Sequence, residues 1–156
     1  RHDPNIKVIW CDTLFNSTKT YEHSKSLISK YGLNIHRYQS KRNKEDIEAS
    51  FQWESLDDTQ FIEFSNLVKI EPFQRALNEH NPDVWFTNIR VRQTEYRDKK
   101  DILSYSKDGI LKVSPFYYYS DADLDQWVHK NNLSKNSDYY DPVKVLSDRE
   151  CGIHFQ

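Results

Sequence analysis

The sequence predicts an α/β domain in which most strands run parallel, and three observations carry this prediction. Ile6–Cys11 is a short and nearly continuous apolar run, which is typical of a strand buried on both faces. Positions from Ser17 to Tyr31 then follow helical spacing, and Leu33–Tyr38 alternates as a second strand would. Because a strand, a helix and a strand with short connections form a βαβ unit, the two strands should belong to one parallel sheet.

The middle of the chain predicts further helices. Lys44–Trp53 and Asp57–Leu67 carry aromatic and aliphatic residues at helical spacing. Pro72 suits the first turn of another helix, which should reach His80 and end at Asn81-Pro82.

Three short apolar segments predict strands in the second half. Asp83–Ile89 is apolar enough for a third parallel strand. Ile102–Ser106 and Ile110–Val113 are joined by Lys107-Asp108-Gly109, which is a suitable hairpin connection. We therefore expect a hairpin after the third parallel strand.

One more helix and a tail should complete the chain. Ser120 is a suitable N-cap for a helix that runs through Val128. Beyond Leu133 the periodic pattern ends among polar and tyrosine residues. We therefore place a nucleotide-binding type of α/β domain in residues 1–133 and a mobile C-terminal tail in residues 134–156.

Composition limits the function classes. The chain has 156 residues, enough for one domain with a sizeable core. Its 22 basic and 24 acidic residues give a formal net charge of −2, so there is no general case for nucleic acid or acidic membranes as partners. It has no apolar run of about 18 residues and opens with no secretory signal. We expect a cytoplasmic location with reduced thiols.

Two residue types are scarce or absent. The 3 glycines, Gly32, Gly109 and Gly152, lie far apart, whereas a glycine-rich phosphate loop needs several close together. Any phosphate must therefore be held by side chains or by a segment that the sequence lacks. Methionine is absent even at position 1, which indicates that Arg1 is not the natural start.

Cys151 is the candidate nucleophile. Arg149 lies two residues before it and His154 three residues after it. Nearby positive charge favours the thiolate, which is the form that attacks. The spacing alone leaves a passive thiol open. A metal site at Cys151 and His154 would need a further soft ligand, and Cys11, the other cysteine, lies in a predicted strand.

A second candidate site is an arginine-rich segment that follows the third strand. Guanidinium groups bind sulfate and phosphate in a bidentate manner. The candidate ligands here are Arg90, Arg92, Gln93 and Arg97. A solvated loop whose arginines pair with acids such as Glu95 remains the alternative. Lys112 and His154 would join an anion site if the fold brings them there.

Polar residues follow the first strand. Asp12 and Thr13 stand where the carboxyl edge of a parallel sheet would be, which is where ligands of open α/β sheets usually bind. A helix cap is the alternative for this pair. The clusters Tyr117–Tyr119 and Tyr139–Tyr140 indicate packing, or aromatic faces that stack on nucleobases.

Several motifs in order resemble one enzyme family. Glu150-Cys151-Gly152-Ile153-His154 is similar to the Glu-Cys-Gly-(Leu/Ile)-His signature of the phosphoadenylyl-sulfate (PAPS) reductases. Further segments that resemble the family, in the same order, are Val8–Thr13 with Thr20-Tyr21, Val68–Pro72 with Arg75–Leu77, Trp85–Arg97, and Gly109–Val113 with Pro115. The resemblance covers nearly the whole chain.

The resemblance implies a fold and a reaction. The fold is a Rossmann-like, mostly parallel sheet flanked by helices, of the adenine-nucleotide α-hydrolase kind. Its N-terminal βα unit, with a Ser-Gly-Gly-x-Asp-Ser loop, is missing from this sequence. The implied reaction is the thiol-dependent reduction of PAPS to sulfite and adenosine 3′,5′-bisphosphate in sulfate assimilation. It passes through an S-sulfocysteine, and thioredoxin or glutaredoxin supplies the electrons.

The same resemblance implies roles for single residues. Cys151 is the nucleophile, with His154 and Glu150 beside it in the catalytic motif. Asp12 and Thr13 lie near the adenosine. The residues implied around the anionic groups of the substrate are Arg90, Gln93, Arg97, Lys112 and His154, and we add Arg92 and Arg149 as further candidates for substrate binding.

The sequence also departs from the family. Leu14 and Asn88 stand where the family has glycine, and Val91 stands where it has arginine. With Cys11 and Cys151 as the only cysteines, a four-cysteine iron–sulfur cluster is impossible, so we expect no such cluster and no metal. Two alternative functions remain: non-catalytic nucleotide binding, and an enzyme of the same superfamily that acts on adenylyl sulfate. A homodimer is left open.

Overall fold

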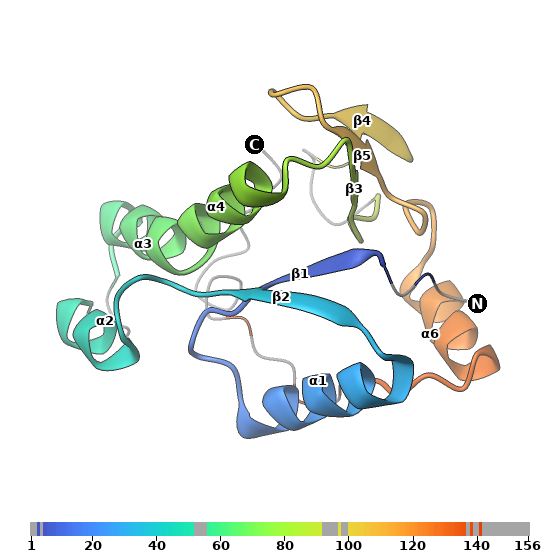
Figure 1. Cartoon of the computed structure of the whole chain (residues 1–156), viewed down its shortest axis with the longest axis horizontal. Coiled ribbons are helices and arrows are strands. Elements are labelled where there is room, and N and C mark those ends of the chain that lie inside the picture. Colours follow the sequence, from blue (N-terminus) through green and yellow to red (C-terminus); the bar gives the residue numbers. More distant parts are fainter. Residues whose placement is uncertain are drawn as a thin grey trace. The chain divides into compact units, whose positions relative to one another are not determined.

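The computed structural model of the chain describes residues 3, 5–51, 56–91, 97, 100–136, 138 and 141 (Figure 1). The chain divides into two compact units. The described residues within 1–80 and 136–153 form unit 1, and those within 81–135 form unit 2. Helices and strands occur in both units, which confirms the predicted α/β class.

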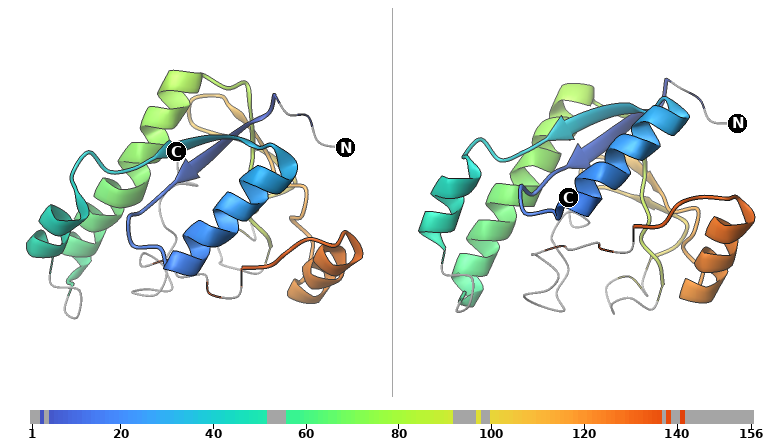
Figure 2. Two further views of the ribbon diagram at one scale, coloured as in Figure 1. Left: turned by 60° about the horizontal axis from the view of Figure 1, so that its bottom comes forward. Right: turned by 90° about the horizontal axis from the view of Figure 1, so that it is seen from below.

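Unit 1 begins with the predicted βαβ arrangement. β1 (Lys7–Cys11) and β2 (Asn34–Tyr38) pair in parallel, with Cys11 opposite Tyr38. α1 (Thr18–Tyr31) connects them. Figures 1 and 2 show α1 on one side of the two strands and a long helical run on the other side.

The ends of α1 follow from local chemistry. Ser17 is the N-cap, and its side chain accepts a hydrogen bond from the backbone N–H of Thr20 at 3.3 Å. Gly32 ends the helix with φ of +59°, a left-handed conformation that glycine adopts without a steric penalty. Local chemistry therefore accounts for both ends of α1.

The helices of the middle differ from the prediction in two ways. α2 (Lys44–Ser50) is confirmed but ends earlier, because Phe51 is already extended. α3 (Asp58–Ser65), the π-helical turn η2 (Asn66–Ile70) and α4 (Glu71–His80) follow one another without a break, so the two separate helices that we expected form one run.

A π turn joins α3 to α4 directly before a proline. The backbone N–H of Glu71 donates to the carbonyl of Asn66, five residues earlier. Pro72 has no N–H, and in a regular α-helix its ring would clash with a carbonyl of the preceding turn. The wider π turn stands where that clash would fall. Pro72 lies in the first turn of α4, which ends at His80, and both features are as predicted.

The core of unit 1 is built on aromatic side chains. Phe64 is fully buried, and its ring lies 5.8 Å from that of Phe15 and 5.6 Å from that of Phe51, centre to centre. Ile47 and Val68 are also fully buried. The ring contacts pack α3 onto the loop that follows β1 and onto the residue that ends α2.

Unit 2 contains a separate sheet. β3 (Val84–Phe86) pairs in parallel with β5 (Leu111–Val113), which pairs antiparallel with β4 (Leu103–Tyr105), so the order is β3-β5-β4. The predicted hairpin is confirmed, and Gly109 at its turn has φ of +84°. The strand predicted within Asp83–Ile89 is present but shorter, and it pairs in parallel with β5 in a different sheet from that of β1 and β2.

α6 (Asp121–Lys130) follows the sheet of unit 2. Ser120 is its N-cap, as predicted, and forms a capping box with Asp123: the backbone N–H of Asp123 donates to Ser120 Oγ at 3.1 Å, and the Asp123 carboxylate accepts from the backbone N–H of Ser120 at 2.9 Å. Among the described residues, no helix combines the length and the apolar character needed to cross a membrane.

Candidate active site

Asp12 lies directly after β1 and has no exposed surface. Its Oδ1 accepts hydrogen bonds from the backbone N–H of Leu14 at 3.0 Å, Asn16 Nδ2 at 2.7 Å and the Tyr21 hydroxyl at 2.9 Å. Its Oδ2 accepts from Gln39 Nε2 at 2.9 Å and from the Arg37 guanidinium, whose Nε lies at 2.7 Å. The carboxylate therefore uses its acceptor positions within the protein.

Two opposing effects set the protonation of Asp12. Burial by itself would raise the pKa of this carboxyl. The hydrogen bonds from Leu14, Arg37, Gln39 and Tyr21 favour the ionised form, and together they hold the pKa below its ordinary value. The Arg37 guanidinium is held in turn over an aromatic pair, 5.3 Å from the ring centre of Trp10 and 5.3 Å from that of Tyr21.

The loop after β1 has an unusual backbone. Thr13 is 6% exposed, and its Oγ1 accepts from the backbone N–H of Phe15 at 3.4 Å. Leu14 has φ of +72°, a left-handed conformation that is uncommon for a residue with a Cβ. Because Ser17 is the N-cap of α1, the alternative that Asp12 or Thr13 caps this helix is wrong.

Arg90 lies after β3 in unit 2 and contacts the start of α6. Its Nη2 donates to Asp121 Oδ1 at 2.6 Å, and its Nη1 lies 3.5 Å from the carbonyl oxygen of Tyr119. The side chain of Arg90 is 15% exposed and that of Asp121 is 89% exposed. Arg90 thus pairs with an acid, as the alternative interpretation of this segment expected, and the acid belongs to a later helix.

Two more cations of unit 2 are buried. Arg97 is 7% exposed, and its carbonyl oxygen accepts a hydrogen bond from the Tyr117 hydroxyl. Lys112 in β5 is 5% exposed, with its ammonium 5.0 Å from the ring centre of Trp85 on the neighbouring strand. Burial lowers the pKa of Lys112, and the positive charges of Lys100 and Lys107 lower it further.

The remaining candidate residues lie outside the described part of the chain. They are Arg92, Gln93, Arg149, Glu150, Cys151 and His154. Of the others, Asp12 and Thr13 belong to unit 1, whereas Arg90, Arg97 and Lys112 belong to unit 2. Their assignment to substrate stays a prediction.

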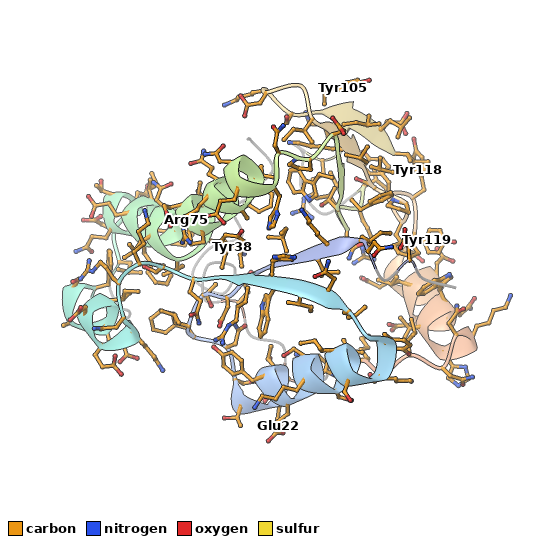
Figure 3. All side chains as sticks on the ribbon, in the orientation of Figure 1. Glu22, Tyr38, Arg75, Tyr105, Tyr118 and Tyr119 are labelled. Atoms are coloured by element: carbon orange, nitrogen blue, oxygen red, sulfur yellow. The ribbon has the colours of Figure 1, made fainter. Side chains whose placement is uncertain are left out.

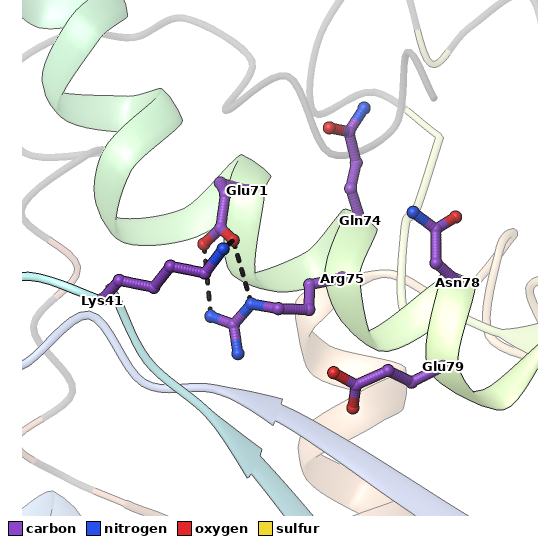
Figure 4. Close-up of a pocket in the computed structure, with 6 residues that line it drawn as sticks. All are labelled: Lys41, Glu71, Gln74, Arg75, Asn78 and Glu79. Carbon is purple, nitrogen blue, oxygen red and sulfur yellow. Dashed lines mark hydrogen bonds and ion pairs between the residues drawn. The ribbon is translucent and has the colours of Figure 1, made fainter.

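A polar pocket of about 410 Å³ lies along α4 (Figure 4). Arg75 Nε donates to Glu71 at 2.9 Å, and Lys41 Nζ lies 3.5 Å from the same carboxylate. The hydrogen bond from Arg75, opposed by partial burial and supported by Lys41, lowers the pKa of Glu71. Arg75 also donates to the carbonyl of Gln39 at 2.6 Å and lies over the ring of Tyr38, which ties α4 to the end of β2 (Figure 3).

Sequence reasoning missed one buried ion pair. Lys69 Nζ lies 2.6 Å from Asp141 Oδ2, and these side chains are 12% and 4% exposed. Lys69 belongs to the segment Val68–Pro72 that resembles the family, but Asp141 lies in the predicted tail, where no sequence pattern indicates a partner.

The described residues contain no set of side chains that could bind a metal ion. Within that part of the chain, no cluster of three or more histidine, cysteine, aspartate or glutamate side chains is placed to hold an ion. The expectation that the protein needs no iron–sulfur cluster rests on its two cysteines and stays a prediction.

Comparisons with known proteins agree on one family. A family model described as the phosphoadenosine phosphosulfate reductase domain matches residues 1–147. The phosphoadenosine 5′-phosphosulfate reductase of Synechocystis sp. is 35% identical over 97% of this chain and 70% of its own length. The enzyme of the same name from Synechococcus sp. is 30% identical over 83% of this chain and 56% of its own length.

A solved structure supports the fold. The crystal structure of PAPS reductase from Candida auris, in a phosphate complex, is similar with a TM-score of 0.70 at 24% identity, over 84% of this chain and 63% of that one. The chain thus spans between about half and about three quarters of the length of the relatives it matches. The chain belongs to the phosphoadenosine phosphosulfate reductase domain family.

Proposed function

We propose that this protein reduces PAPS to sulfite and adenosine 3′,5′-bisphosphate in assimilatory sulfate reduction, with Cys151 as the nucleophile. The observation that carries the proposal is the Glu-Cys-Gly-Ile-His sequence at residues 150–154 in a chain of this family. Relatives that are named for this activity support it.

The first step is a thiol attack on sulfur. The thiolate of Cys151 attacks the sulfur atom of the terminal sulfo group, so an S–S bond forms. The bond between that sulfur and the bridging phosphate oxygen breaks, and adenosine 3′,5′-bisphosphate leaves with the electron pair. Cationic groups stabilise such a leaving group, and Arg97 and Lys112 are the predicted cations for this role.

The second step needs two electrons from a dithiol. A thiolate of thioredoxin or glutaredoxin attacks the Cys151 sulfur, sulfite leaves, and a mixed disulfide forms. The second thiol of the donor then attacks its own partner sulfur, which releases Cys151 as a thiol and leaves the donor as a disulfide. A reducing, cytoplasmic compartment suits this donor.

Replacing Cys151 tests the mechanism. Cys151→Ser should lower sulfite release by at least about a thousandfold and abolish the S-sulfo adduct in mass spectrometry, because an alcohol is a far weaker nucleophile here than a thiolate. Cys11→Ala is the matched control, since Cys11 lies in β1. This variant should keep both sulfite release and formation of the S-sulfo adduct. Undiminished turnover in Cys151→Ser would refute the mechanism.

Adenylyl sulfate is the second candidate substrate. Val91 stands where the resembling family has an arginine, which removes one cation that could recognise a 3′-phosphate. Turnover on PAPS and on adenylyl sulfate, measured side by side, decides between the two. Nucleotide binding in calorimetry without turnover on either substrate would favour a non-catalytic binding role instead.

A further inference from the structure

The segment that leads toward Cys151 returns to unit 1 and binds the start of α1. Asn136 Nδ2 donates to Thr20 Oγ1 at 3.0 Å. The hydroxyls of Ser17 and Thr20 donate to the carbonyl of Asp138 at 3.1 and 3.4 Å. These contacts join residues that are more than a hundred positions apart in the sequence.

The ion pair between Lys69 and Asp141 is a second attachment of the same segment. Its side chains are 12% and 4% exposed at a separation of 2.6 Å. The pair between Lys135 and Asp125 has the same separation, but its side chains are 67% and 57% exposed. Because a buried charge is unfavourable without its partner and a surface pair contributes little, the first pair constrains the chain and the second does not.

The π turn is the element that carries Lys69. Its backbone hydrogen bond spans five residues instead of the four of an α-helix, so it changes the direction of the side chains around it. Such turns often occur at functional sites. Val68, its neighbour, is fully buried and fixes the turn in the core. Lys69 is therefore presented from a well-packed element.

We propose that Lys69 and Asp141 anchor the base of the C-terminal tail and so position Cys151, ten residues further along the chain. This inference rests on the proposed function, since it concerns the nucleophile of that reaction. Ten residues span at most about 36 Å, so a fixed Asp141 confines the volume in which the thiol must meet its target. Confinement makes the attack effectively intramolecular and raises the effective concentration of the thiol. Lys69 and Asp141 are positioning residues.

The test combines amide hydrogen exchange with single-turnover chemistry. The variants are Lys69→Met, which keeps the aliphatic stem without the charge, and Asp141→Asn, which keeps the shape. Lys69→Arg is the conservative rescue, and Lys135→Met is the matched control at the exposed pair. Each protein is assayed for exchange in peptides that span residues 136–141, for the rate of S-sulfo adduct formation with PAPS, and for alkylation of Cys151 by iodoacetamide without substrate.

Loss of the anchor should have a distinct signature. In Lys69→Met and Asp141→Asn, exchange across residues 136–141 should rise about tenfold while exchange in β1 stays unchanged. The rate of adduct formation should fall about tenfold, since small misplacements of reacting groups have effects of this size or larger. The PAPS concentration for half-maximal rate and the alkylation of Cys151 should stay near the wild-type values. Lys69→Arg should recover the rate, and Lys135→Met should match wild type.

Other results would overturn the proposal. Unchanged exchange across residues 136–141 in Asp141→Asn would show that the pair is not an anchor. Raised exchange with an adduct rate equal to that of Lys135→Met would show that the anchor does not position the thiol. If wild type forms no adduct with PAPS, the proposed function fails and the positioning of Cys151 for that reaction fails with it, whereas the exchange experiment still decides whether Asp141 is anchored. If exchange in β1 also rises in Lys69→Met, that variant has lost its fold and Asp141→Asn decides.

Discussion

Leu14 has a left-handed backbone, with φ of +72°, directly after the buried carboxylate of Asp12. Hydrogen bonds on both sides hold this conformation: Asp12 Oδ1 accepts from the backbone N–H of Leu14, and Thr13 Oγ1 accepts from that of Phe15. A residue with a Cβ is strained in this region, and glycine is not. Leu14 thus keeps this turn at a local cost in strain.

The strain at Leu14 predicts an inverted stability order. Leu14→Ala and Leu14→Gly both remove the half-buried side chain, but only glycine relieves the left-handed conformation. Leu14→Gly should therefore be more stable than Leu14→Ala by about 1 kcal/mol, although glycine is usually the less stable of the two. Urea unfolding of both variants measures the difference. Equal stability, or a more stable alanine variant, would contradict the strain.

At the scale of elements, a polar cluster joins β1, β2 and α4. Tyr38 donates to Glu79 at 2.6 Å and lies 3.0 Å from His80 Nε2, while Lys7 Nζ lies 3.3 Å from His80 Nδ1. The rings of His36 and His80 meet edge to face at 4.5 Å. Because the Lys7 ammonium can only donate, it faces an unprotonated Nδ1, so the cluster fits a neutral His80.

This cluster predicts a pH dependence near neutrality. Burial, followed by the charges of Lys7 and His36, holds the pKa of His80 below its ordinary value, against an opposing effect of Glu79. The folded state therefore binds fewer protons than the unfolded state between the lowered pKa and about 6.5. Stability should be fully present above about pH 6.5 and fall as the pH drops through that window.

Two measurements check the role of His80. Urea unfolding should show a smaller loss of stability between about pH 7 and pH 5.5 in His80→Gln than in wild type, since glutamine does not titrate. Proton NMR should show the His80 imidazole titrating below about 6.5. Titration at or above that value would contradict the prediction.

At the scale of the whole molecule, the chain forms two units and then returns to the first. Within unit 1, one carboxylate unites distant segments: Asp12 accepts from the loop after β1, from Tyr21 of α1 and from Arg37 and Gln39 at the end of β2. Asn136 and Asp138 then attach to the start of α1, and Asp141 attaches to the π turn. Polar contacts over long sequence distances therefore organise unit 1 around the end of β1.

The network at Asp12 predicts acid sensitivity. Its pKa is held below the ordinary value, because the hydrogen bonds outweigh the opposing effect of burial. The stability that it contributes is therefore present above about pH 4 and is lost as the pH falls through the lowered pKa. Asp12→Asn should lower the free energy of unfolding at neutral pH by about 2 kcal/mol, and the free energy of unfolding should then fall less steeply as the pH drops. Urea unfolding from pH 7 to pH 2.5 measures both effects. A variant as acid-sensitive as wild type would contradict this role.

Local patterns predicted most elements because their signals lie within a few residues. The apolar run of β1, the caps Ser17 and Gly32 of α1 and the turn glycine of the hairpin each act on neighbouring backbone. The same reasoning correctly placed Pro72 in the first turn of a helix that ends at His80, but it did not predict that η2 joins α3 to α4. A proline usually starts a helix, and no short-range signal announces the π turn that accommodates it here.

The sequence by itself determined the α/β class, the order of most elements and, through its ordered motifs, the family and the candidate nucleophile Cys151. Only the tertiary structure decided that the carboxylate of Asp12 is fully engaged by the protein and that Lys69 meets Asp141 across 72 positions of sequence. The physical reason is that helices, turns and caps depend on neighbouring residues. Burial and long-range ion pairs depend instead on which segments the folded chain brings together.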